Sequence, residues 1–484
     1  MRLNYLLIGR LLSFLLAVNG LLMLLCLPVS IAFSDGAAAD MAISGVVVIS
    51  LAGLLRYLTR NSSNKMGSRE GYLIVFLGWV LMTLTGTIPY VLNGALGDSY
   101  TRIFFETISG YTTTGATILD TIEGLPQSIL LWRSITQWVG GMGIIVLAVA
   151  ILPLLGVGGM QLFIAESPGP STNKLHPRIR ETARRLWLIY LFLTVCETLL
   201  LSLGGMSVFE AVCHAFTTVS TGGFSTRDAS IAAFDSAYIE WVVISFMFLS
   251  GVNFTLTWFL LTGEPRRLFR NEEFRLYLLI VVSFVAAISL ILGFDSGELS
   301  SRAVRETCFQ VVSLLTTTGF VTADYAGWPV GAGALLLVLM FTGGSAGSTS
   351  GGIKVVRHLI VLKHSWLELT RLIQPHAVVP VRFNRRVVSE RIVFNVHSFF
   401  LLYLFIFVAG MVFIAITEGG WMTSIGAAVA CLGNIGPGWG RVGPSTTYAQ
   451  ISDTGLWGLG FLMLLGRLEL FTGLVLFNPG FWRR

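Results

Sequence analysis

Four short stretches of threonine, serine, asparagine and glycine recur along this chain of 484 residues, and each could offer backbone oxygens to a cation. Each stretch follows an apolar segment long enough for about two to three helical turns. Glycine adopts backbone angles that other residues avoid, so it can aim carbonyl groups inward without a Cβ clash. The four stretches are Thr112 to Thr117, Ser220 to Ser225, Thr316 to Phe320 and Gly433 to Gly438.

The four stretches align on one glycine each. Gly115, Gly223, Gly319 and Gly436 are separated by 108, 96 and 117 residues. A single Thr-Thr-Gly string is typical of a turn or of a small-residue contact between membrane helices. Four copies at the same place between two apolar segments indicate an internal repeat instead.

The apolar segment before each stretch is too short to cross a bilayer, so we expect it to dip into the membrane and return. Non-helical backbone at membrane depth is tolerated only where it is buried in protein or lines a watery cavity. Four such segments around one axis would form a ring of carbonyl oxygens, which can replace the hydration shell of a potassium ion. The short helices would point their partially negative C-terminal ends at the cavity and favour a cation. The predicted filter residues are Thr113, Thr114, Gly115, Thr221, Gly222, Gly223, Thr317, Thr318, Gly319, Asn434, Ile435 and Gly436.

The composition places these segments in a membrane protein. Hydrophobic residues make up 54% of the chain and charged residues only 12%, whereas soluble domains are about 25% charged. Apolar runs of about 20 residues, the length that spans a bilayer, recur throughout. We expect ten spans, at 11–32, 41–58, 71–93, 128–156, 184–205, 237–262, 275–295, 330–357, 392–417 and 454–477.

The basic residues fix the direction of these spans. Of the 32 lysines and arginines, 25 lie at the two ends of the chain or in alternate connections between spans. The positive-inside rule puts those connections and both termini in the cytoplasm, and the even number of spans agrees. Because the net charge of +6 belongs to these loops, it does not indicate a nucleic-acid groove.

The predicted fold is an all-α membrane protein in which four pseudo-repeats of helix, pore loop and helix surround a central pore. Two further membrane helices precede the repeats. The expected units are an N-terminal helix pair at 1–69 and pore repeats at 70–182, 183–270, 271–390 and 391–484.

The eighth span is interrupted by a polar run with five glycines in ten residues. Each glycine costs a helix roughly 1 kcal/mol relative to alanine, so we expect the helix to break there. A flexible strand below the filter could act as a gate, and the alternative is a static kink. The residues of this predicted gate are Gly343, Gly344, Ser345, Gly347, Gly351 and Gly352, together with Arg467 from the last span.

Several charged residues lie close to the expected pore. Arg467, midway along the tenth span, is expected to face the pore below the filter and to contact the broken helix, or else to form a buried structural ion pair. Glu469 is two residues further on and is expected to point to another face of the helix. Glu106, Glu210 and Glu306 either attract cations at the pore mouth or cap helices.

The four filter stretches, with Gly343 to Lys354 and Gly466 to Glu469, resemble the Trk/Ktr/HKT superfamily of potassium transporters over nearly the whole chain. The closest likeness is to the bacterial TrkH branch. The resemblance implies a homodimer with one pore per protomer, a cytoplasmic nucleotide-binding regulatory subunit of the TrkA type, an intramembrane loop at the helix break, and the bacterial inner membrane. Glycine in all four filter strands is similar to the potassium-preferring members, although the strands depart from a strict Thr-Val-Gly-Tyr-Gly.

Motifs of enzymes are present but lack their structural context. Gly343 to Gly347 fits the G-x-S-x-G pattern, yet it lies in an apolar span, and none of the six histidines is an obvious base. Gly438 to Gly443 matches G-x-G-x-x-G without a preceding strand of a βαβ unit. The five cysteines show no CxxC spacing and predict neither a metal site nor disulfides. We therefore expect no enzyme and no cofactor beyond the transported potassium ion.

Two transport mechanisms stay open. In the first, potassium is taken up through a gated, channel-like pore. In the second, the broken helices form an occluded site that couples potassium to proton or sodium symport. Acidic residues deep in the spans are scarce, Glu197 and Glu469 being the main ones, which favours the pore.

Overall fold

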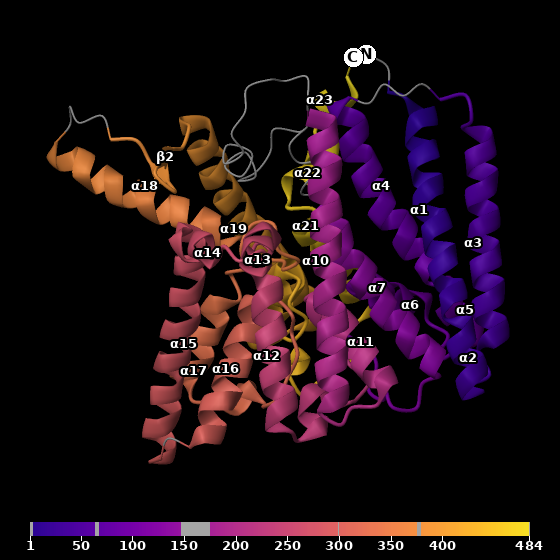
Figure 1. Ribbon diagram of the computed structural model, residues 1–484, viewed down its shortest axis with the longest axis horizontal. Coiled ribbons are helices and arrows are strands. Elements are labelled where there is room, and N and C mark those ends of the chain that lie inside the picture. Colours follow the sequence, from indigo (N-terminus) through magenta and orange to yellow (C-terminus); the bar gives the residue numbers. More distant parts are fainter. Residues whose placement is uncertain (1–2, 63–66, 147–174, 299, 375–378, 484) are drawn as a thin grey trace.

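The computed structural model describes residues 3–62, 67–146, 175–298, 300–374 and 379–483. These residues are mostly helical, which confirms the predicted fold class. Their single sheet is a small hairpin in which β1 (Arg382–Phe383) pairs with antiparallel β2 (Arg386–Val387). The two ends of the chain lie beside each other at one end of the molecule (Figure 1).

Six helices or helix pairs within the described residues are long and apolar enough to cross a membrane. Their outward side chains are apolar too: Phe14 is 67% and Leu401 71% exposed in the isolated chain. Helices that are apolar on all sides are typical of a lipid environment. These elements are α1 (Tyr5–Leu25) with α2 (Leu27–Phe33), α3 (Ala38–Leu58), α4 (Ser68–Gly86) with α5 (Ile88–Asn93), α10 (Leu175–Leu203), α15 (Glu272–Ser296) and α19 (Glu390–Glu418).

Two spans predicted as continuous are sharply bent, so the expectation at 237–262 and 454–477 was wrong in this respect. The first consists of α12 (Ala237–Gly251) and α13 (Phe254–Leu261), at 114° to each other. The second consists of α21 (Asp453–Arg467) followed by α22 (Phe471–Leu474) and η7 (Val475–Phe477), at 110°. Counting each bent pair as one span gives up to eight spans in the described residues.

The remaining two predicted spans have different outcomes. Of 128–156, the structure describes only the part within α7 (Gln127–Val146), and the rest lies outside the described residues. The break predicted in 330–357 is confirmed, because α17 (Val330–Leu339) ends well before α18 (Val355–Ile373) begins. In Figure 1, α18 extends sideways from the bundle.

Four short helices precede the four polar stretches. Ser207 and Glu210 form a capping box at the start of the second, and Ser300 caps the third by accepting a hydrogen bond from the Ala303 amide. Each helix ends within three residues of the left-handed turn that opens its polar stretch. The four are α6 (Tyr100–Tyr111), α11 (Val208–Val219), α16 (Ser301–Leu315) and α20 (Trp421–Gly433).

The other elements are short and connect these helices. Two are α-helices of one or two turns, and four are 3-10 helices in the connections that follow the polar stretches. They are α14 (Pro265–Arg270), α23 (Pro479–Trp482), η3 (Ser230–Phe234), η4 (Tyr325–Gly327), η5 (Gly440–Val442) and η6 (Tyr448–Gln450).

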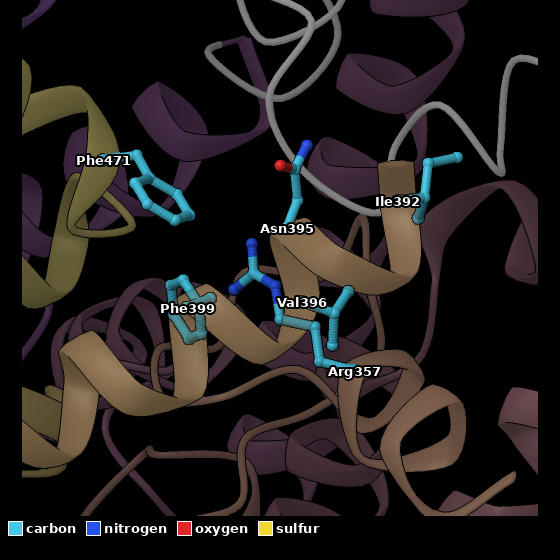
Figure 2. Close-up of a pocket in the computed structure, with 6 residues that line it drawn as sticks. All are labelled: Arg357, Ile392, Asn395, Val396, Phe399 and Phe471. Carbon is cyan, nitrogen blue, oxygen red and sulfur yellow. The ribbon is translucent and has the colours of Figure 1, made fainter. Parts of the chain in front are cut away.

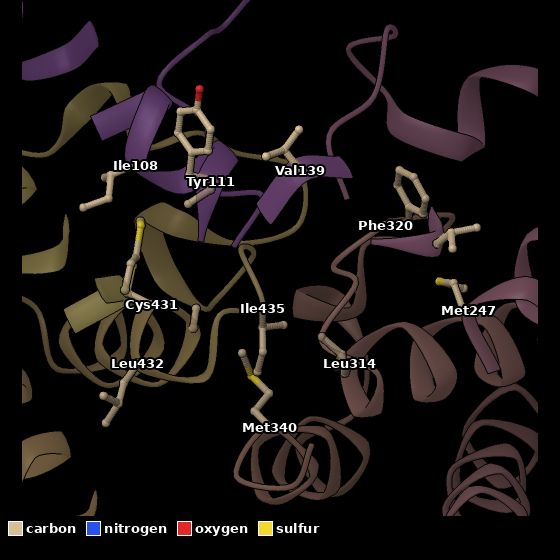
Figure 3. Packing of buried hydrophobic residues seen from close by; sticks show 14 of the residues in the cluster. Ile108, Tyr111, Val139, Met247, Leu314, Phe320, Met340, Cys431, Leu432 and Ile435 are labelled. Atoms are coloured by element: carbon tan, nitrogen blue, oxygen red, sulfur yellow. The ribbon is translucent and has the colours of Figure 1, made fainter. Parts of the chain in front are cut away.

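The hydrophobic core brings the short helices together. Tyr111 from α6, Leu314 from α16 and Leu432 from α20 belong to one buried cluster with Ile435 and Met340 (Figure 3). These side chains are all at most 1% exposed. The core therefore surrounds the polar stretches and holds their backbone in place.

Candidate functional site

The four polar stretches share one unusual backbone pattern. In the first, Thr113 has φ of 51° and Gly115 has φ of 79°. The same left-handed angles recur at the aligned positions of the other three stretches: Thr221 and Gly223, Thr317 and Gly319, Asn434 and Gly436. A left-handed conformation costs a residue with a Cβ about 1 kcal/mol or more. Strained backbone of this kind clusters at functional sites.

The four stretches form a closed ring. A Cβ built on Gly115 would lie 2.2 Å from the carbonyl oxygen of Gly222 in the second stretch. Each aligned glycine faces the next stretch in the same way, and the fourth faces the first. The corresponding distances are 1.9 Å from Gly223 to the Thr318 oxygen, 1.9 Å from Gly319 to the Ile435 oxygen and 2.6 Å from Gly436 to the Thr114 oxygen. Only glycine permits this approach of neighbouring backbones.

All the residues predicted for the filter are therefore brought together, three from each stretch. Hydroxyl pairs support the first and third stretches, because Thr114 lies 2.8 Å from Thr112 and Thr318 lies 2.8 Å from Thr316. The fourth stretch is joined to the first by the side chain of Asn434, which donates to the Thr114 hydroxyl at 3.1 Å.

Buried polar residues also stand nine positions before three of the four aligned glycines. Glu106 accepts hydrogen bonds from the Ile118 amide (2.9 Å) and the Thr117 hydroxyl (3.0 Å), and pairs with Arg133 of α7 at 2.7 Å. Before the second stretch, the imidazole of His214 lies 3.0 Å from the Ser225 hydroxyl. The corresponding residue before the third stretch is Gln310, and before the fourth it is Ala427, which has no polar group.

Each of the three glutamates singled out in the sequence has a partner in the structure. Glu106 is 1% exposed and holds the chain after the first stretch by accepting a hydrogen bond from the Ile118 amide, so it does not cap α6. Glu210 does cap α11, and it also pairs with Arg227 at 2.7 Å. Glu306 pairs with Arg302 one turn away on α16.

We expect Arg133→Met to destabilise the protein by roughly 3 kcal/mol, because it leaves the Glu106 carboxylate buried without its partner. Thermal unfolding of the purified protein in detergent measures the effect as a lower Tm. Arg302→Met is the matched control: its ion pair is exposed, so its Tm should change little. Equal Tm shifts in the two variants would contradict this role of Arg133.

The predicted gate residues lie in the irregular segment between α17 and α18, directly against the ring. The amide of Gly351 donates to the Thr317 hydroxyl at 2.6 Å, and a Cβ on Gly351 would lie 2.5 Å from the Gly433 oxygen. Thr349 donates to the Val219 oxygen at 3.0 Å. The segment, which contains Gly343, Gly344, Ser345, Gly347, Gly351 and Gly352, thus contacts α11, the third polar stretch and the end of α20.

The same segment explains the bend between α12 and α13. Its Ser345 amide donates to the Gly251 oxygen at 2.8 Å, and its Gly347 oxygen accepts from the Phe254 amide at 3.2 Å. Two backbone groups that a continuous helix would use internally are therefore bonded to the segment. Glu273 of α15 holds it from the other side by accepting from the Ala346 amide at 2.6 Å.

Arg467 is 1% exposed and lies at the C-terminal end of α21, next to the bend within the tenth predicted span. Its guanidinium donates to the Thr349 oxygen of the segment and to the Gly140 oxygen of α7, both at 2.9 Å. The predicted contact with the broken helix is confirmed. Among the described residues its hydrogen-bond partners are carbonyl groups, so the alternative of a structural ion pair is not supported.

Glu469 pairs with Arg357 instead, which ties α18 to the bend after α21. The Arg357 guanidinium also lies 3.9 Å from the centre of the Phe399 ring. Figure 2 shows the Arg357 guanidinium between Phe399 and Asn395 of α19, and the three residues line a small pocket together with Phe471. Glu469 was expected on another face of the same helix, but α21 ends at Arg467 and Glu469 lies in the bend with φ of 51°. Its partner Arg357 was not identified from the sequence.

Apolar helices of membrane-spanning length around a closed ring of strained, glycine-bearing backbone define a multi-pass membrane transport protein. The chain belongs to the TrkH family of cation transport proteins, whose sequence profile matches residues 38–483.

Known proteins are similar to this chain along almost its whole length. The Trk system potassium uptake protein TrkH of Salmonella typhimurium is 43% identical over 458 residues, which is 94% of each chain. The protein of the same name from Vibrio parahaemolyticus is 40% identical over 479 residues, 98% of each chain. A crystal structure of the potassium transporter TrkH from Vibrio parahaemolyticus matches with a TM-score of 0.91 and 37% identity, over 99% of this chain and 100% of the other.

Proposed function

We propose that this protein takes up potassium ions across the bacterial inner membrane through a gated, channel-like pore. The observation that carries the proposal is the closed ring in which four aligned glycines each approach the carbonyl oxygen of the next stretch. A ring of backbone oxygens can coordinate a dehydrated potassium ion. The relatives named above are potassium uptake proteins of Trk systems.

The segment from Gly343 to Gly352 is the proposed gate, and Arg467 holds it in place. The segment lies against the filter ring and carries three glycines, Gly343, Gly344 and Gly351, that pack closely on other backbone. Its movement would open or obstruct the path of an ion that has left the filter.

The wider assembly follows from the same proposal. The termini and the basic loops lie in the cytoplasm, in accord with the positive-inside rule. The functional unit is a homodimer in lipid, each protomer with its own pore, and a cytoplasmic nucleotide-binding subunit of the TrkA type regulates it. The filter strands are the site of the transported potassium ion.

Rubidium uptake into proteoliposomes tests the proposal directly. We expect the purified protein to take up rubidium, and an equal concentration of sodium to compete only weakly. Equal competition by sodium would contradict a potassium filter. Unitary currents in planar bilayers would support the pore, whereas a fixed stoichiometry of potassium to protons or sodium would support symport.

A further inference from the structure

The second stretch of the ring lacks a side chain at a position where the first and third have threonine. The residue before the aligned glycine is Thr114 in the first stretch and Thr318 in the third, and each has its hydroxyl pair. The second stretch has Gly222 there, without a side chain, although Ser220 offers a hydroxyl at the place of Thr112 and Thr316. Some other group must support this stretch.

That group is Gln137, which reaches the second stretch from α7. Its Nε2 donates to the Gly222 carbonyl oxygen at 2.7 Å, and its Oε1 accepts from the Phe224 amide at 3.0 Å. A Cβ on Gly222 would lie 2.4 Å from the Gln137 carboxamide carbon. The glutamine therefore occupies the space of the missing threonine and bonds a carbonyl oxygen of the ring itself.

The fourth stretch has a comparable tie, that is, a side-chain hydrogen bond to one of its carbonyl oxygens. The phenol of Tyr448, which is 2% exposed, donates to the Gly436 carbonyl oxygen at 2.7 Å. The Tyr448 amide donates to the Thr117 oxygen at 2.8 Å, which fixes the tyrosine against the first repeat.

These two ties lie on opposite sides of the ring, because the second and fourth stretches are each flanked by the first and third. In each of the four stretches, the aligned glycine and the residue before it have one carbonyl oxygen each. Two of these oxygens, those of Gly222 and Gly436, accept the hydrogen bonds from Gln137 and Tyr448. In the described part of the chain, the other six accept no hydrogen bond. The ring thus has two restrained stretches and two whose oxygens are free.

We infer that Gln137 and Tyr448 are positioning residues that set the discrimination between potassium and sodium, an inference that rests on the proposed filter. Sodium is the smaller ion, so carbonyl oxygens must move further toward the axis to coordinate it. An oxygen held from behind by a hydrogen bond resists that movement. The two ties therefore disfavour sodium while the free oxygens of the first and third stretches adjust to potassium.

Tyr448→Phe and Gln137→Leu test the inference, since each removes the donor and keeps most of the side-chain volume. We expect the potassium-to-sodium permeability ratio, measured from reversal potentials in planar bilayers, to fall roughly fivefold in each, the effect of one net hydrogen bond. Tyr403→Phe is the matched control: this buried tyrosine on α19 has no hydrogen-bond partner among the described residues. Its ratio should equal that of the unmodified protein.

A double variant separates the effect of the Gln137 hydrogen bond from the effect of the space that Gln137 fills. Gln137→Ala combined with Gly222→Thr refills the space and recreates the hydroxyl pair with Ser220, but supplies no donor to the carbonyl of position 222. The ratio should stay low in the double variant. Recovery of the full ratio would show that Gln137 only fills space and would overturn its role.

The outcomes distinguish this inference from the filter itself. If Tyr448→Phe and Gln137→Leu keep the normal ratio while Gly319→Ser lowers it, the inference is wrong and the filter stands. If all three keep the normal ratio, and Gly115→Ser keeps it as well, the filter proposal also fails. Tyr448→Phe removes a single oxygen atom, so it tests the role of the ties even if Gln137→Leu fails to fold.

Discussion

Gly319→Ser is expected to lower the potassium-to-sodium permeability ratio at least roughly tenfold, which corresponds to about 1.4 kcal/mol of lost differential binding. Gly319 has φ of 78°, and a Cβ there would lie 1.9 Å from the Ile435 oxygen and 2.8 Å from Pro437. Neither neighbour is the end of a flexible side chain. The third and fourth stretches must therefore separate, and the ring of oxygens widens or loses its register.

Gly297→Ser is the matched control for this experiment. Gly297 has nearly the same φ, 75°, but nothing lies within 4 Å of its hypothetical Cβ. The control therefore carries the backbone strain without the collision, and its ion selectivity should be unchanged.

Serine substitutions at the four aligned glycines should lower the potassium-to-sodium permeability ratio in a definite order. Serine at Gly223 or Gly319 should be most disruptive, at Gly115 less so and at Gly436 least, following the distances of 1.9, 1.9, 2.2 and 2.6 Å to the neighbouring oxygens. Reversal potentials of the four variants measure this order. Unchanged ratios at both Gly115 and Gly319 would contradict the filter assignment.

The positions of the four stretches could be predicted because each is marked by local chemistry. A half-length apolar segment followed by threonine and glycine cannot be a span, whatever surrounds it. Repetition then identified Gly436 as the partner of Gly115, although Asn434 and Ile435 replace the threonines of that stretch. The boundaries of the five units stay predictions.

The two sharp bends could not be predicted, because tertiary contacts cause them. The residues of α13 are as apolar as those of α12. The break arises where Gly251 and Phe254 form hydrogen bonds to the segment between α17 and α18, which we propose as the gate. At the other bend, Glu469 and Leu470 have φ of 51° and 55° without a glycine to signal it. One local signal was available: Asn253 caps α13 by accepting from the Thr255 amide.

Residues that support the ring from other elements were missed for a similar reason. Gln137 and Arg133 lie on one predicted span, and nothing in their spacing indicates which of the later stretches they contact. Gln137 bonds residues 85 and 87 positions away. The buried position of Glu106 was equally invisible, since its partner Arg133 is 27 residues further along the chain.

Arg467→Ala is expected to raise ion flux roughly tenfold or more. The guanidinium joins Thr349 of the gate segment to Gly140 of α7. A hydrogen bond from a charged group contributes about 1.5–3 kcal/mol, and about 1.4 kcal/mol changes an equilibrium tenfold. Losing the contact to Thr349 should therefore release the segment, and losing the charge should lower the barrier to a cation below the filter. Rubidium uptake per mole of reconstituted protein measures the change.

Arg467→Lys separates the two causes. Lysine keeps the positive charge, but a single ammonium group cannot reproduce the planar guanidinium that spans two carbonyl groups on different elements. Flux near that of the unmodified protein would assign the effect to charge, whereas flux near that of Arg467→Ala would assign it to the link between segment and helix. Equal or lower flux in Arg467→Ala, with normal protein yield, would instead mean that Arg467 serves the fold, because opening the link between Thr349 and Gly140 would then have no effect on the passage of ions.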